Sequence, residues 1–233
     1  MSDKDDRPGE RPEWANTTSA EMLAGAGRGN RASWERLVSL YAPLVLCWCR
    51  RRGLRGELSQ DAPDLVQQVF MTVSRRIATF NRHGRGAFHG WLHEISNRWI
   101  SAYWRRHRDV IIDPTKLDFL PARKASSGPD GSSNVGESPT PGELVIILRG
   151  LLEQIRPDFE HRTFQAFLKV AVDGRPAKDV AEELGMTRNN VYQAKFKVLK
   201  RLEQEFEALG LPVNKRKMAT AACVAGTKSE VKS

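Results

Sequence analysis

The chain has 233 residues and a formal net charge of +9, with a sequence pI of about 9.7. This length suits one large domain or two small ones, and the basic excess favours a polyanionic partner, either nucleic acid or an anionic membrane. The longest apolar run, Leu144 to Leu148, is far shorter than the roughly 20 residues of a membrane span, and the first residues are acidic and polar. We therefore expect a cytoplasmic protein without membrane insertion.

Cysteine and histidine spacing gives no sign of a metal site. Cys47 and Cys49 lie beside Trp48, and Cys223 lies in a polar stretch near the end of the sequence. There is no Cys-x-x-Cys motif, and the histidines have no mutual spacing, with carboxylates nearby, that would suit zinc. We predict no metal and no cofactor, core or near-surface thiols at Cys47 and Cys49, and histidines at the surface.

Helical periodicity begins after a charged, proline-containing stretch. Residues 1–16 are expected to be disordered. From Thr17 the pattern passes through Met22 and Leu23 and continues in an apolar stripe of Trp34, Leu37, Val38, Tyr41, Leu44, Val45 and Trp48. The stripe ends in the basic cluster 50–53.

A third helix is predicted over residues 61–80. Its continuous apolar face consists of Leu65, Val66, Val69, Phe70, Val73, Ile77 and Phe80. The other face consists of Asp64, Gln67, Gln68, Met71 and Arg75. Polar groups around an exposed methionine suit a modest protein contact, and the alternative is an ordinary solvated face.

A fourth helix is predicted over residues 87–107, and it combines aromatic with basic side chains. Its aromatic residues include Trp91, Trp99, Tyr103 and Trp104. Its arginines are Arg98, Arg105 and Arg106, and Arg108 follows directly after the helix. Aromatic rings stack on unpaired bases while arginines hold phosphates, as in single-stranded DNA binding. Trp91 is assigned to the core, whereas Tyr103 and Trp104 could serve either the core or DNA.

The composition changes after this helix. Residues 110–142 are rich in serine, glycine and proline, which predicts a flexible linker between two helical domains. Further helices are expected near 143–155, 158–172, 177–184 and 187–209, followed by a basic, disordered tail from 210 to 233. No strand alternation is present, so the predicted fold is all-α.

Residues 176–202 read as a helix-turn-helix. An apolar stripe of Ala177, Val180, Ala181 and Leu184 marks its first helix. Gly185 ends that helix, because glycine takes the left-handed cap conformation without steric cost, and Thr187 can cap the next helix through its hydroxyl.

The second helix of this motif has a polar face opposite Val191, Val198 and Leu202. Asparagine and glutamine side chains can pair with adenine edges, and lysine can reach guanine or phosphate. Replacement of Lys200 or Arg201 is expected to weaken DNA binding across all sequences, as for phosphate contacts. Every charge from 185 to 202 is basic, whereas acidic residues follow at once. This segregation favours a DNA major groove over a merely soluble helical hairpin.

The order of these segments resembles the extracytoplasmic-function sigma factors of bacterial RNA polymerase, over about 17 to 209. Residues 64–70, DLVQQVF, resemble the family's clamp-binding helix, and 88–92, FHGWL, resemble the start of its promoter-melting helix. Residues 174–186 resemble the helix-turn-helix that reads the minus-thirty-five element. The resemblance implies sigma region 2 over 17–109 and sigma region 4 over 143–209.

The resemblance also implies partners and site residues. The partners are core RNA polymerase, through its β′ clamp and β flap, promoter DNA and, as a candidate, an anti-sigma factor. The implied polymerase contacts are Asp61, Asp64, Gln67, Gln68 and Met71. The implied minus-ten and melting residues are Arg98, Tyr103, Trp104, Arg105, Arg106 and Arg108. The implied minus-thirty-five residues are Arg188, Asn189, Asn190, Tyr192, Gln193, Phe196, Lys197 and Lys200.

Some positions depart from the family pattern. Gln68 stands where glutamate is common, Arg98 where asparagine is frequent and Ala102 where aspartate is frequent.

A nuclease or recombinase would need clustered carboxylates or a nucleophile beside arginines, and the sequence offers neither grouping. The alternative function is that of a stand-alone helix-turn-helix transcriptional regulator. Such a regulator normally carries a dimerisation or ligand domain, whereas this chain has a tryptophan-rich basic helix and a long linker, as expected of a polymerase subunit.

Overall fold

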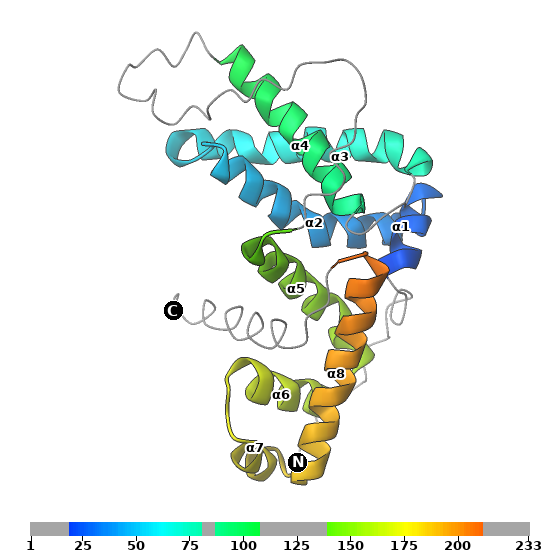
Figure 1. Ribbon diagram of the computed structural model, residues 1–233, viewed down its shortest axis with the longest axis vertical. Helices are drawn as coiled ribbons and strands as arrows, with labels where there is room; N and C mark the ends of the chain where they lie inside the picture. Colours follow the sequence, from blue (N-terminus) through cyan, green and yellow to red (C-terminus); the bar gives the residue numbers. More distant parts are fainter. Residues whose placement is uncertain (1–18, 81–86, 108–138, 212–233) are drawn as a thin grey trace, which may run out of the picture.

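The computed structural model describes residues 19–80, 87–107 and 139–211, and over these ranges every regular element is helical. The first half contains α1 (Ser19–Gly27), α2 (Arg31–Arg51), η1 (Gly56–Asp61), α3 (Ala62–Arg76), η2 (Ile77–Thr79) and α4 (Ala87–Arg106). The second half contains α5 (Pro141–Ile155), η4 (Arg156–Asp158), α6 (His161–Phe167), η5 (Leu168–Val172), α7 (Ala177–Leu184) and α8 (Arg188–Ala208). The all-α prediction is confirmed, and Figure 1 shows the arrangement.

Local sequence signals explain where several helices begin. The Asn30 side chain accepts a hydrogen bond from the Ser33 amide at 2.8 Å and so caps α2. Thr140 and Glu143 form a reciprocal capping box at the start of α5, with Pro141 as the first helical residue. The helix predicted over 158–172 is instead divided, because Arg156–Asp158 is a 3-10 turn and Leu168–Val172 is a π-helix.

Three long helices form the first half of the molecule. The apolar stripe of α2 is buried against α3 and α4, with Leu37, Tyr41 and Leu44 almost fully enclosed. The Tyr41 and Phe88 rings meet edge to face with centroids 4.9 Å apart. Helix α3 therefore directs its predicted polar face away from this core.

The sequence predicts two helical domains separated by a flexible linker. Within the described residues the two halves instead pack against each other. Helix α5 lies against α2, and the end of α8 reaches α1 (Figure 1). Buried side chains from both halves, including Leu40 and Leu151, belong to one continuous apolar cluster. The predicted linker falls almost wholly on residues 108–138, and residues 1–18 and 212–233 likewise lie outside the described part.

A second, smaller apolar cluster holds the helix-turn-helix together. It joins α6, α7 and the first turns of α8 through Ala166, Val180, Ala181, Val191 and Ala194. In Figure 1 this unit lies at the opposite end of the molecule from α3 and α4. No described helix is long and apolar enough to cross a membrane.

Candidate polymerase- and DNA-binding surfaces

The turn between α7 and α8 has the geometry that the sequence predicts. Gly185 is left-handed, with φ of 60° and ψ of 39°, and its amide donates to the carbonyls of Ala181 and Glu182. The Thr187 hydroxyl accepts a hydrogen bond from the Asn190 amide at 3.1 Å. Both predictions are confirmed, and the turn fixes the direction in which α8 leaves α7.

The outer face of α8 is exposed over its first three turns. Val191, Ala194 and Val198 are buried beneath it. Tyr192 and Phe196 are 58% and 62% exposed, which is unusual for large hydrophobic side chains. All the predicted minus-thirty-five residues are exposed: Arg188, Asn189, Asn190, Tyr192, Gln193, Phe196, Lys197 and Lys200.

Arg201, expected from the sequence to contact phosphate, is instead engaged within the protein. Its Nε atom lies 3.1 Å from an Asp158 carboxylate oxygen, and its guanidinium also pairs with Glu205. Its side chain is only 14% exposed. The expectation that Arg201 faces DNA is therefore wrong, because carboxylates brought near by the fold already neutralise it.

Ion pairs hold α7 to the segment before it. Glu183 contacts the Lys169 ammonium at 2.7 Å and the Arg175 guanidinium at 2.6 Å. The hydrogen bonds from these two cations lower the pKa of Glu183. These exposed ion pairs add only modestly to the apolar contacts of Val180 and Ala181, which hold α7 beneath α8.

The exposed face of α3 carries most of the predicted polymerase contacts. Asp64 and Gln67 are exposed, Gln68 is half-buried, and the Met71 side chain is 41% exposed. Asp61 differs from these residues, since it accepts a hydrogen bond from the Tyr103 hydroxyl at 2.6 Å. That contact ties the start of α3 to the end of α4.

The aromatic side chains of α4 are used mainly inside the protein. Tyr103 is only 4% exposed, and burial together with the Asp61 hydrogen bond raises the pKa of its hydroxyl. Trp104 is half-buried and donates its indole N–H to the Arg52 carbonyl at 3.0 Å. The ring of Tyr103 therefore offers no surface to a base in this conformation, which corrects its assignment to DNA.

The arginines of α4 remain at the surface. Arg98, Arg105 and Arg106 are exposed, although Arg98 pairs with Glu94 one turn earlier. Arg108 lies outside the described residues. Basic side chains thus surround a helix end whose aromatic residues are largely packed.

Comparisons with known proteins agree with the resemblance seen in the sequence. A family model described as Sigma-70 region 2 matches residues 37–110, which include most of α2 and all of α3 and α4. The ECF RNA polymerase sigma factor SigD of Mycobacterium tuberculosis is 26% identical over 193 residues, covering 81% of this chain and 84% of that protein. The protein of the same name from Mycobacterium bovis gives the same values. Together these two findings support an extracytoplasmic-function sigma factor.

This sigma factor directs RNA polymerase in transcription initiation. Sequence reasoning missed several side chains that position its surfaces, because their partners are remote in the chain. The Trp99 indole donates to the Thr72 hydroxyl at 2.9 Å, which joins α4 to α3. A tryptophan and a threonine separated by 27 positions give no pattern that periodicity could detect.

Proposed function

We propose that this sigma factor divides its work among three surfaces. The face of α3 holds core polymerase at the β′ clamp, the basic end of α4 assists promoter opening, and the outer face of α8 reads the upstream element. The observation that carries the proposal is the capped helix-turn-helix, whose predicted base-reading side chains are all exposed together on α8.

The proposed partners follow from these surfaces. Core polymerase and promoter DNA are the partners of a sigma factor, and we infer a second polymerase contact between sigma region 4 and the β flap. An anti-sigma factor is a further candidate partner. The site of action is that of the polymerase, the cytoplasm, and we assign the protein no catalytic step.

The polymerase contact can be tested on α3. Asp64→Arg combined with Gln67→Ala is expected to weaken binding of core polymerase while leaving the helical circular dichroism signal unchanged, because both side chains point away from the core. The measurement is a quantitative pull-down with core enzyme. Glu35→Arg, a charge reversal on the exposed surface of α2, is the matched control. Wild-type binding by the double variant would remove α3 from the contact.

The melting role can be tested on the arginines of α4. Arg105→Ala combined with Arg106→Ala is expected to reduce permanganate-reactive thymines at the start site, with polymerase binding retained. The salt dependence of opening should fall by about one phosphate contact for each arginine. A pre-melted bubble template should restore most of the transcription.

Tyr103→Phe is the control for this prediction. It removes the hydrogen bond to the Asp61 carboxylate, at a cost of about 1.5–3 kcal/mol in stability, while the buried ring is kept. It should therefore lower the unfolding temperature without a selective loss of promoter opening. Equal losses by the double arginine variant on duplex and bubble templates would count against a melting role for α4.

A further inference from the structure

The basic cluster 50–53 ends α2, and it belongs to none of the three proposed surfaces. Arg50 and Arg51 occupy the last turn of the helix, Arg52 follows as its C-cap, and Arg55 comes two residues after the left-handed Gly53. Positive charges are favoured at a helix C-terminus. Arg55 serves that purpose, since its Nε atom donates to the Arg50 carbonyl at 2.8 Å. This structural role does not determine where the Arg52 guanidinium lies.

Arg51 is neutralised within the protein. Its guanidinium donates to a Glu143 carboxylate oxygen at 2.8 Å, and the Trp48 indole donates to the same oxygen at 2.9 Å. The other Glu143 oxygen lies 3.4 Å from His89 Nε2. His89 is only 4% exposed because Trp48 and Glu143 lie against it, which corrects the expectation that it lies at the surface. Arg51 and His89 therefore belong to the folded core of the protein.

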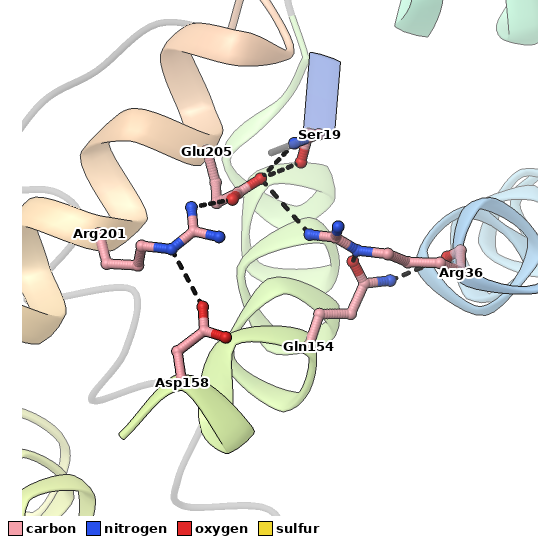
Figure 2. A network of polar contacts seen from close by, with 6 residues as sticks. All are labelled: Ser19, Arg36, Gln154, Asp158, Arg201 and Glu205. Atoms are coloured by element: carbon pink, nitrogen blue, oxygen red, sulfur yellow. Dashed lines mark hydrogen bonds and ion pairs between the residues drawn. The ribbon is translucent and has the colours of Figure 1, made fainter. Parts of the chain in front are cut away.

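The polar network around Glu205 shows how this fold compensates buried arginines (Figure 2). Arg36, with 3% of its side chain exposed, lies 3.7 Å from a Glu205 carboxylate oxygen and donates to the Gln154 side chain at 2.7 Å. Arg201 pairs with Asp158 and with the same Glu205. Each of these guanidinium groups meets a carboxylate where it leaves water, as the burial of a charge requires.

Arg52 is held without such compensation. Its Nε atom is buried and has no hydrogen-bond partner among the described residues. Its Nη2 atom reaches the Ser101 hydroxyl of α4, at a long 3.4 Å. Asp61, the carboxylate that the fold brings to the end of α4, binds the Tyr103 hydroxyl at 2.6 Å instead. Within the described part of the chain, no carboxylate pairs with Arg52.

Trp104 fixes the end of α2 against α4. Its indole N–H donates to the Arg52 carbonyl at 3.0 Å, and a Cβ atom at Gly53 would lie 3.1 Å from Trp104 Cζ2. Gly53 also has a φ of 99°, a conformation that favours glycine. Arg105 follows Ser101 by one helical turn, so it lies on the side of α4 that Arg52 contacts. The tertiary structure thus brings cations from two helices to one place.

The chemistry of this place favours the phosphates of duplex DNA. Cations held close together repel one another, and a polyanion relieves that repulsion. A single strand would also need an exposed aromatic ring on which its bases stack. Tyr103 is 4% exposed and Trp104 is half-buried against the α2 turn, so phosphate contacts are available here without a stacking surface.

A protein partner fits this place less well. Protein interfaces deplete charged residues at their centre and enrich aromatic residues and methionine. The exposed large hydrophobic side chains of the described residues lie instead on α3 and α8, and they are Met71, Tyr192 and Phe196. The cluster is also continuous with the basic end of α4, where the proposed function places promoter DNA.

We propose that Arg52 and Arg55 of the α2 turn, with Arg105 of α4, form a phosphate-binding site that holds the promoter duplex beside the opened segment, whatever its base sequence. The proposal rests on the proposed function, since it places this duplex next to the basic end of α4. Phosphate contacts fix position without reading bases. The site therefore anchors DNA that the outer face of α8 selects.

Thermal unfolding tests whether Arg52 serves DNA or the fold. Arg52→Gln removes the charge and keeps part of the side-chain stem. Because Arg52 has no carboxylate partner in the described structure to lose, the Tm of this variant is expected to stay at or above that of the parent. A decrease of more than about 4 °C would make Arg52 a structural residue and overturn the proposal.

Binding of polymerase holoenzyme to a promoter duplex at several salt concentrations tests the phosphate contacts. The slope of log K against log salt should lose about 0.9 in magnitude for each contact, so about 1.8 for Arg52→Gln with Arg55→Gln. The loss of affinity should be at least about tenfold at 50 mM salt and shrink about tenfold by 200 mM. Promoters with altered upstream elements should show the same loss. An unchanged slope would overturn the proposal.

Two further variants and a pull-down complete the test. Arg52→Lys with Arg55→Lys keeps both charges and should restore most of the slope. Arg28→Gln with Arg31→Gln removes two exposed charges near the start of α2, about 30 Å away, and should keep the parent's slope. An equal decrease in this control would mean that net charge alone sets the slope, against the proposal.

The pull-down uses core polymerase without DNA. Equal binding by the parent and by Arg52→Gln with Arg55→Gln is expected. Weaker binding by the variant would assign the cluster to a polymerase contact and overturn the DNA site. A parent holoenzyme without promoter-directed transcription would instead refute the proposed function.

Discussion

Glu205→Ala is expected to lower the free energy of unfolding by about 3–5 kcal/mol, because removing one partner leaves an uncompensated buried charge. The carboxylate is fully buried, and it is shared by Ser19, Arg36 and Arg201. Loss of the carboxylate leaves two guanidinium groups in a site with little access to water.

Urea or thermal unfolding measures this effect. At this chain length about 1 kcal/mol corresponds to roughly 2–4 °C, so a decrease of about 6–20 °C in Tm is expected. Glu207→Ala, two positions further along α8 and exposed, is the matched control and should stay within about 0.5 kcal/mol of the parent. A change below about 1 kcal/mol in Glu205→Ala would mean that the network does not stabilise the docked halves.

Asn189→Ala and Gln193→Ala are expected to alter which upstream element is selected. Each lost base contact should cost about 1–3 kcal/mol at its own base pair, because amide side chains read base edges by paired hydrogen bonds. Lys200→Ala should weaken binding across all sequences, since a phosphate contact carries no sequence information. Selection from a promoter library with polymerase holoenzyme separates these two outcomes.

Gln204→Ala provides the matched control for that selection. It removes the same side chain from an exposed position about 16 Å further along α8. We expect the parent's upstream preference from this variant. An unaltered preference in Gln193→Ala would show that this glutamine does not read bases directly.

The amino-acid sequence by itself determined the local structure and the directions of the surfaces. The limits of α4, the left-handed turn at Gly185 and the cap at Thr187 depend on neighbouring residues, so periodicity and capping chemistry predicted them. The same periodicity placed Asp64 and Gln193 on exposed faces. The order of these segments also indicated the family.

Tertiary structure alone decided what covers each apolar or charged side chain. Tyr103 and Arg201 looked like DNA contacts, yet Asp61 and Asp158, which bind them, lie 42 and 43 positions away in the chain. Glu205 is only four positions from Arg201, but it is the fold that buries this pair. The docking of the two halves depends on pairs still more remote, such as Ser19 with Glu205, separated by 186 positions. Periodicity shows which side of a helix is apolar, but the surface that buries that side is chosen by long-range packing and by the pairing of charges removed from water.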